Sequence, residues 1–322
     1  MEQLIGHEWA KQLLVTNIAA NRVPHAILVT GMPNIGKTTL CRFVGQALNC
    51  TGSGTRPCGE CLNCHKTVSG NHPDIAILDE PGEPIKIEEV RTLQQQLSLT
   101  PYEGAWRIAI LCDFERATRE AANALLKTLE EPPPQVVMML TATEPDILLP
   151  TIVSRCQVLS LRPLPVDQVK QALMQYWHAS EAQADLLSHV SAGRLGWAIS
   201  AMQDSVILER RETAIEDLLN LMSKNRVERL AYARALSRNP QLVTETLEYW
   251  LSWWHDLLTL RGGVGGYVIN VDQVAGLQQR AELVTLQEVK NMVDQLRYTM
   301  RAIDQNANVR LALEVLLLSL PR

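Results

Sequence analysis

Hydrophobic residues follow two different patterns along the chain, and the change falls near residue 164. Before it, five short apolar runs lack the polar alternation of a half-exposed strand, which is typical of strands buried on both faces of a parallel sheet. These runs span residues 26–30, 75–78, 107–112, 136–143 and 158–161. Between them, helical spacing is found in residues 37–48, 87–97 and 119–129. The order predicts an α/β domain with a parallel sheet and crossover helices.

Beyond Pro163 and Pro165 the chain keeps only helical periodicity. A small helical group comes first, at residues 166–177, 181–190 and 195–202. A longer series of amphipathic helices follows at 206–322, interrupted by the glycine-rich stretch 261–266. The chain is therefore expected to form three domains, the last of them all-helical, at residues 1–163, 164–204 and 205–322.

The composition describes a globular protein with more than one domain. A chain of 322 residues is too long for a single core of about 100–150 residues. No segment approaches the roughly 18 uninterrupted apolar residues of a membrane span. The start, Met1-Glu2-Gln3-Leu4, lacks the basic and apolar layout of a signal peptide. We therefore expect a cytoplasmic protein without a membrane partner, in which cysteines are not expected to form disulfides.

Charge and aromatic content argue against a general nucleic-acid binder. The formal net charge is −5, whereas binding to phosphates depends on clustered Lys and Arg. Two Phe, six Tyr and seven Trp give little material for a platform on which bases stack. We expect any contact with DNA to be local or to be made by a partner.

A phosphate-binding loop is expected directly after the first apolar run. The stretch GMPNIGKTTL begins at Gly31 and has Walker A spacing, with a predicted strand before it and a predicted helix after it. In such a loop backbone N–H groups surround phosphate oxygens, the lysine reaches the outer phosphates and the threonine ligates Mg²⁺. Asn34 stands where a further glycine is common, but asparagine tolerates positive φ. The candidate residues for binding ATP or ADP with Mg²⁺ are Gly31, Asn34, Gly36, Lys37, Thr38 and Thr39.

Four cysteines are crowded into residues 50–64. Cys50, Cys58, Cys61 and Cys64 have the spacing C-x7-C-x2-C-x2-C, and two overlapping C-x2-C steps let thiolates converge on one tetrahedral ion. A full set of four protein ligands leaves no open position for catalysis, so the pattern predicts a structural zinc module. The alternatives are ligation through His65, a redox pair, or unrelated thiols.

Two further motifs complete a resemblance to a known family. Together with the phosphate loop and the four-cysteine insertion, AANALLKTLEEPP (121–133) and PTIVSRCQ (150–157) resemble the clamp-loader branch of the AAA+ ATPases. The match covers most of the chain. Segments 250–263 and 306–318 resemble a stator subunit of that branch more than its gamma/tau motor subunit.

The resemblance implies a function in DNA replication. Residues 1–163 would form the AAA+ nucleotide-binding domain, 164–204 a helical lid, and 205–322 a collar that closes a five-membered ring. The implied partners are gamma/tau and delta subunits of DNA polymerase III, and through the complex the sliding clamp and primer-template DNA. The ring opens the clamp and loads it onto primed DNA.

Arg155, in the SRC motif, matches the arginine finger of the family. A finger enters the site of a neighbouring subunit and stabilises charge on the γ-phosphate there. The local alternative is a side chain that neutralises the C-terminal end of a helix expected at 146–153. The resemblance also makes Lys127, Glu130 and Glu131 candidates for contacts with the neighbour.

The carboxylate pair that holds magnesium and activates water is incomplete. Counting back from Asn123, the Asp-Glu pair of the family falls on Cys112 and Asp113. A cysteine cannot serve hard Mg²⁺ as a carboxylate would. If the alignment slips by one residue, Asp113 becomes the magnesium ligand, Phe114 takes the place of the base and Glu115 points elsewhere. Neither alignment restores the pair.

Of the positions that would sense the third phosphate, some have suitable residues and others do not. Thr141 and Thr143 suit a γ-phosphate-sensing position at the end of the fourth predicted strand. Gly196 stands where motor subunits have a sensing arginine. Arg194, two residues away, points about 200° elsewhere on a helix.

These observations favour a stator that binds, or once bound, nucleotide, hydrolyses little or none itself, and presents Arg155 to a neighbour. The enzyme alternative is a gamma/tau-like motor that uses Lys37, Thr38 and Asp113. A zinc-dependent nucleic-acid binder is a third class, weakened by the acidic charge and the short cysteine loop.

Overall fold

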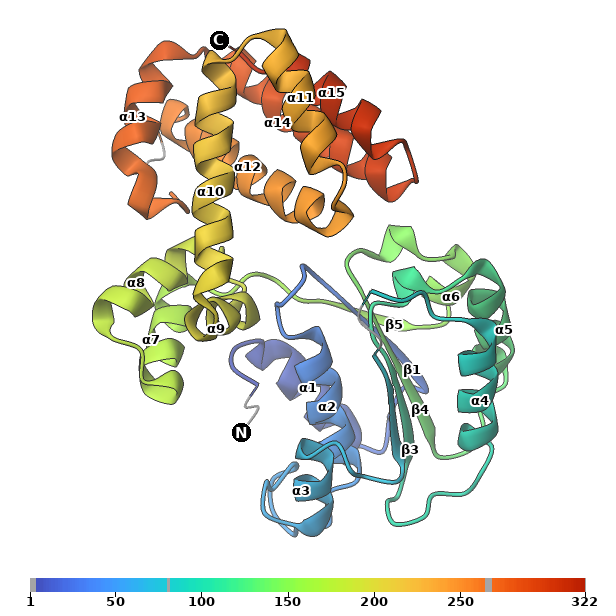
Figure 1. Cartoon of the computed structure of the whole chain (residues 1–322). Helices are drawn as coiled ribbons and strands as arrows, with labels where there is room; N and C mark the ends of the chain where they lie inside the picture. The colour runs from blue at the N-terminus through green and yellow to red at the C-terminus, as the bar shows by residue number, and fades with distance from the viewer. Residues whose placement is uncertain (1–3, 80–81, 264–267, 322) are drawn as a thin grey trace. The chain divides into compact units, whose positions relative to one another are not determined.

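The computed structural model describes residues 4–79, 82–263 and 268–321 (Figure 1). The chain divides into two compact units, each described by itself below. The first comprises Met1–Gln168 with Gly193–Gly196, and the second Val169–Ala192 with Trp197–Arg322. The three-domain division expected from the sequence stays a prediction.

A five-stranded parallel sheet is the centre of the first unit. Its order is β2-β3-β4-β1-β5. The strands are β1 Ala26–Thr30, β2 Ile75–Leu78, β3 Arg107–Leu111, β4 Val136–Ala142 and β5 Gln157–Ser160. Every residue of β1 and β4 is buried, because helices cover both faces of the sheet. The α/β class and the parallel sheet predicted from the apolar runs are confirmed.

Helices pack on both faces of this sheet (Figure 1). One face carries α1 Glu8–Ala19, α2 Lys37–Leu48 and α3 Leu62–Val68, and the other α4 Ile87–Leu97, α5 Arg119–Glu130 and α6 Pro150–Val153. Alternate strand residues serve the two cores: Ile27 and Val29 pack on the α2 side, and Ala26 and Leu28 on the α4–α5 side. The single helix expected at 146–153 is wrong, because the 3₁₀ turn η2 (Pro145–Ile147) comes first and α6 begins only at Pro150.

The remaining elements are all helical, which confirms the expected all-α C-terminal region. They are α7 Val166–Trp177, α8 Glu181–Val190, α9 Leu195–Gln203, α10 Ser205–Ser223, α11 Arg226–Leu236, α12 Pro240–Arg261, α13 Val274–Leu283, α14 Leu286–Asp304 and α15 Val309–Ser319, with a 3₁₀ turn, η4 Val271–Gln273, before α13. Of the glycine-rich stretch 261–266, residues 264–266 lie outside the described residues.

Three tryptophans of α12 form the centre of the C-terminal core. Trp250, Trp253 and Trp254 are at most 1% exposed. The indole nitrogen of Trp250 donates to the carbonyl of Ala214 in α10 at 2.7 Å, so the buried polar atom is satisfied. The long helix therefore stays in a fixed register against α10.

Buried Arg229 fastens α11 to the ends of two other helices. It donates to the carbonyls of Leu221 and Met222 at the end of α10 and of Leu317 and Leu320 at the end of α15. Carbonyls in the last turn of a helix lack the usual N–H partner four residues further on, and the guanidinium supplies donors to them. One guanidinium thus holds α10, α11 and α15 together.

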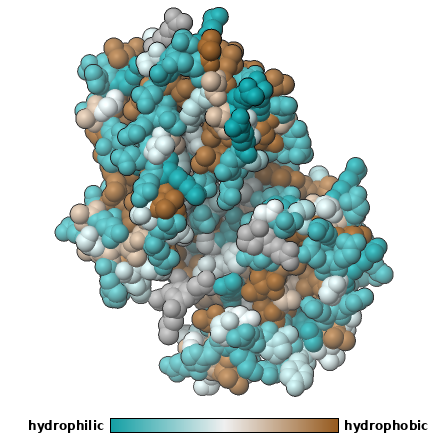
Figure 2. Space-filling view, viewed as in Figure 1, coloured by the Kyte–Doolittle hydropathy of each residue, from teal (hydrophilic) through white to brown (hydrophobic). Residues whose placement is uncertain are grey.

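The surface is mixed rather than apolar. Figure 2 shows hydrophilic residues over both units, with apolar residues scattered among them. Among the described residues, no helix combines the length and apolar character needed to cross a membrane.

Candidate functional site

The predicted phosphate loop connects β1 to α2. Gly31 and Gly36 have φ of 148° and 106°, and Asn34 has a left-handed φ of 62°. A Cβ on Gly31 would come within 3.0 Å of the carbonyl oxygen of Leu161, so the position requires glycine. Asn34 adopts the left-handed backbone conformation that a glycine would otherwise supply, so the loop keeps its curled shape.

Lys37 is buried inside this loop. Its Nζ donates to the carbonyls of Gly31 at 3.0 Å and Met32 at 3.4 Å. Burial lowers the pKa of Lys37, while the nearby charges of Asp113 and Glu115 act in the opposite direction. The ammonium is therefore positioned among the groups that would surround the outer phosphates.

Cys112 and Asp113 lie at this loop, as the resemblance implies. The Sγ of Cys112 is 3.5 Å from the Oγ1 of Thr38, and Oδ1 of Asp113 is 3.9 Å from Nζ of Lys37. Burial raises the pKa of Cys112 to about 11, so the side chain is a neutral thiol at pH 7. The hydroxyl that would ligate magnesium thus has a neutral sulfur beside it, where a carboxylate would be needed.

The sequence missed the position of Glu115. The 3₁₀ turn η1 (Phe114–Arg116) brings its side chain back to the end of β4, where Oε1 accepts the backbone N–H of Thr143 at 3.0 Å. The other oxygen, Oε2, is buried and has no hydrogen-bond partner among the described residues. Neighbouring Thr141 accepts the backbone N–H of Asp113 at 2.8 Å. Both threonines are thus fastened to the segment after β3.

Gly196 packs directly on the phosphate loop. Its backbone N–H donates to the carbonyl of Asn34 at 3.0 Å, and a Cβ there would come within 2.7 Å of the same oxygen. An arginine at this position would clash with the loop backbone. Arg194 is buried, with 8% of its surface exposed. Thr39, predicted beside Thr38, lines a separate cavity of about 390 Å³.

Arg155 lies on the surface directly after α6. Its Nη1 donates to the carbonyl of Thr151 at 2.8 Å, and Nη2 pairs with Oε1 of Glu130 in α5 at 2.7 Å. The side chain is 34% exposed. The contact with Thr151 fits the predicted role at a helix end, and the exposure leaves the guanidinium within reach of another molecule.

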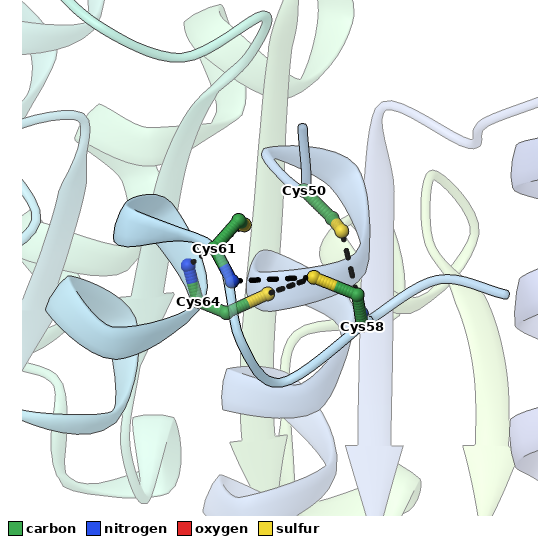
Figure 3. A group of neighbouring side chains, drawn as sticks. All are labelled: Cys50, Cys58, Cys61 and Cys64. Carbon is green, nitrogen blue, oxygen red and sulfur yellow. Dashed lines mark hydrogen bonds between the residues drawn. The ribbon is translucent and has the colours of Figure 1, made fainter. Parts of the chain in front are cut away.

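The four predicted cysteines converge (Figure 3). Cys50 follows α2, Cys58 lies in the loop, Cys61 caps the N-terminus of α3 and Cys64 belongs to α3. Their sulfur atoms all lie within 4.8 Å of one another, and those of Cys58 and Cys64 are 3.9 Å apart. Zn–S distances of ~2.3 Å place the sulfurs of a tetrahedral site about 3.8 Å apart. The cluster can therefore hold a metal ion, and His65 is not a member of it.

Backbone N–H groups support the charged form of these thiols. The N–H groups of Cys58, Cys61 and Cys64 donate to the sulfurs of Cys50, Cys58 and Cys61 at 3.3–3.4 Å. The N–H groups of Glu60 and Cys61 lower the pKa of the Cys58 thiol. Burial raises the pKa of the Cys64 thiol to about 12, so the four thiols differ in how readily they form the thiolates that bind metal ions.

Two family models match the chain. One, described as DNA polymerase III, delta subunit, matches residues 6–165, and the other, described as DNA polymerase III, delta subunit, C terminal, matches residues 205–321. The first match includes the cysteine cluster, and the second lies wholly in the helical region.

Individual relatives agree with these models. DNA polymerase III subunit delta' of Bacillus subtilis (strain 168) is 28% identical over 96% of this chain and 94% of its own. Subunit delta' of Yersinia pestis is 30% identical over 88% of this chain and 85% of its own. Subunit tau of Escherichia coli (strain K12) is 32% identical over 63% of this chain but over only 32% of its own length. With matches that extend along nearly the whole of both delta' relatives, the chain belongs to the delta' family of DNA polymerase III subunits.

Proposed function

We propose that the chain is the stator of a clamp loader, the ring that opens a sliding clamp and places it on primed DNA. It would present Arg155 to a neighbouring ATPase subunit and hydrolyse little ATP itself. The observation that carries this proposal is the neutral Cys112 thiol, 3.5 Å from the Thr38 hydroxyl, at the place where magnesium requires a carboxylate.

The donor set does not fit a catalytic magnesium ion. Mg²⁺ demands hard oxygen ligands in near-octahedral geometry, and a protonated thiol offers none. Asp113 is 48% exposed and lies 3.9 Å from Lys37. Hydrolysis depends on positioning and charge together, so the loss of the ligand beside Thr38 removes a part that the others cannot replace.

Phosphate binding fits the loop better than hydrolysis does. The curled backbone from Gly31 to Thr38 and the ammonium of Lys37 are the groups that would hold the phosphates of ATP or ADP. A bound nucleotide would then supply negative charge that Lys37 balances, and it would act as part of the structure rather than as a substrate.

Arg155 supports action on a neighbouring subunit. Its guanidinium is oriented by Thr151 and Glu130 yet remains at the surface. An arginine supplied in trans is worth roughly 10³–10⁵ in rate where it operates. Arg155 would therefore matter for the turnover of the complex although it is not part of the site of its own chain.

The partners follow from the same assignment. Motor subunits of the gamma/tau type, a delta subunit, the sliding clamp and primer-template DNA would meet this chain in a five-membered ring in the cytoplasm. The helices after residue 205 would form the collar, and a structural Zn²⁺ on the four cysteines would hold residues 50–64. The gamma/tau-like motor is a second candidate, favoured only by the intact Walker A loop.

Reconstitution of the ring with Arg155→Ala tests the arginine finger. We expect normal assembly, and DNA-stimulated ATP hydrolysis that falls by the share of the one motor site that Arg155 serves. Arg155→Lys should lose nearly as much, because an ammonium lacks the planar fork of a guanidinium.

The matched control for this test is Arg162→Ala, which removes an exposed arginine after β5. It should leave turnover unchanged. Unaltered hydrolysis with Arg155→Ala in a fully assembled ring would reject the finger.

A further inference from the structure

A groove between α11 and α15 gathers arginines in an otherwise acidic protein. Its volume is about 500 Å³, and it is lined by Leu230, Ala231, Arg234, Ala235, Arg238 and Arg310. The only charged residues in this lining are the three arginines. The side chains of Ala231 and Ala235 are small, so a ligand in the groove can approach the backbone of α11 closely.

These arginines have free hydrogen-bond donors. Arg234 and Arg238 are exposed, and within residues 4–79, 82–263 and 268–321 no side chain or backbone group pairs with either guanidinium. Arg310 is held through Nε by Oε1 of Glu314 at 2.7 Å, and its two Nη atoms have no partner in the same residues. Arg234 lies in the last turn of α11, and Arg238 lies in the turn that follows the helix.

The groove walls are fixed before any ligand binds. Buried Arg229 joins α11 to the last carbonyls of α15, including that of Leu317 at 3.1 Å. Because this guanidinium is fully used inside the protein, the arginines at the surface are a separate set. A rigid site loses little entropy when it binds, which raises affinity for a given set of contacts.

The local charge is opposite to that of the whole chain. Besides buried Arg229, residues 226–238 contain three exposed arginines and one glutamate, whereas the chain has a formal net charge of −5. Guanidinium groups bind phosphate oxygens through two parallel N–H bonds, and they are preferred over lysine where such bidentate geometry matters. An acidic helix is less suitable, because Leu230 is the only large apolar side chain in the lining and gives it no pocket for an anchor.

We propose that this groove binds the phosphate backbone of a DNA strand. The contact is sequence-independent, because arginines on phosphates position a strand without reading its bases. It is also local, which agrees with the formal net charge of −5 of the whole chain. The proposal does not depend on Arg155 or on ATP hydrolysis, so it can fail while the proposed stator function stands.

Fluorescence anisotropy of a labelled single-stranded thymidine oligonucleotide with the whole chain tests the groove. We expect weak binding that loosens as salt rises from about 50 to 200 mM. Arg234→Glu with Arg238→Glu should weaken binding at least tenfold and reduce the salt slope by about two, one for each lost phosphate contact. If the charge reversal unfolds the chain, the double variant Arg234→Gln with Arg238→Gln is used instead and should also weaken DNA binding.

The matched control is Arg297→Glu with Arg301→Glu on α14. Both residues are exposed and one turn apart, and the pair makes the same change of charge outside the groove. Its affinity should stay near that of the parent. An equal loss of affinity in both double variants would show that only the net charge matters. Unchanged affinity of the groove variants would show that DNA does not bind there. Displacement of the DNA by polyglutamate of equal charge would show that the site does not recognise phosphate. Each of these results overturns the proposal.

Discussion

Cys112 occupies the position that decides the chemistry of the phosphate site. Three groups around it have counterparts in a working site: a curled loop, a buried lysine and a threonine hydroxyl. The thiol differs because it is uncharged, with a pKa raised to about 11 by burial. Cys112 thus removes one ligand that magnesium needs, in addition to the departures at Asp113 and Gly196.

Replacing this thiol with a carboxylate should restore metal dependence. We expect Cys112→Asp to tighten ATP binding in the presence of Mg²⁺ by about tenfold, or roughly 1.4 kcal/mol. A carboxylate would give Mg²⁺ the hard oxygen ligand that the thiol lacks. Titration calorimetry with and without Mg²⁺ measures the change. Cys112→Ser, which is polar but uncharged, is the control and should not gain this dependence. Identical magnesium responses in parent and Cys112→Asp would show that the ion is bound elsewhere.

The buried carboxylate of Asp74 stabilises the fold. Burial would raise the pKa of its carboxyl, but the backbone N–H groups of Gly104, Tyr102 and Glu103, with Arg107, lower it overall. These N–H groups lie at 2.7–2.8 Å. The carboxylate therefore fixes the loop before β3.

Stability should depend on pH through this group. Because the folded pKa is below the unfolded value of about 3.9, the unfolded chain binds more protons, and the contribution of Asp74 is lost as pH falls below about 4. Asp74→Asn should cost about 2–4 kcal/mol at pH 7 and flatten the acid limb of the stability curve. Urea unfolding from pH 7 to pH 3 tests both effects. If the free energy of unfolding of Asp74→Asn falls with pH as steeply as that of the parent, other groups cause the acid sensitivity.

Among the elements, we expect the cysteine loop and α3 to depend most on a bound metal ion. Their thiols come from the segment after α2, a loop and the start of α3, and few apolar side chains hold them together: Leu62 of α3 is 66% exposed. Metal binding is therefore expected to supply much of the folding free energy of this segment.

Removal of the metal should unfold this segment while the sheet stays intact. We expect one Zn²⁺ per chain by elemental analysis, and a thermal midpoint lowered by about 5–10 °C in Cys61→Ser or after chelation. Hydrogen exchange should localise the loss to residues 50–68. Cys156→Ser, outside the cluster, is the control. A chain that is metal-free as purified and keeps four reactive thiols in this loop would contradict the zinc assignment.

Helices and strands were predicted well where the hydrophobic pattern of the sequence is strong. β1, β2 and the helices α2 and α4 were predicted to the residue, because continuous apolar runs and 3.6-residue spacing are strong patterns. Helices α1 and α3 were missed: α1 buries only Ala10 and Leu14, and α3 is seven residues long. The expected helix at 146–153 divided because Leu149, extended before Pro150, separates the turn from α6.

The site was predictable where sequence spacing fixes geometry. Phosphate loops and cysteine clusters are built from neighbours in the chain, so Lys37 and the four cysteines were identified from spacing alone. Glu115 was not, because its direction depends on a 3₁₀ turn with three residues per turn rather than on a regular strand or helix.

At the scale of the whole molecule, the same chain combines a phosphate loop, an exposed arginine and a helical region. The proposed stator function requires these parts to act on neighbours rather than on bound ATP. The two delta' relatives match along nearly their full length, whereas the tau relative matches over 32% of its own. This distribution supports membership of the delta' family.

ATP turnover by the purified 322-residue chain, with and without Mg²⁺, decides between stator and motor. We predict phosphate release no faster than that of Lys37→Ala, because a neutral thiol beside Thr38 cannot hold the metal that hydrolysis requires. Rapid magnesium-dependent release that Lys37→Ala abolishes would contradict the account and make the chain a motor in its own right.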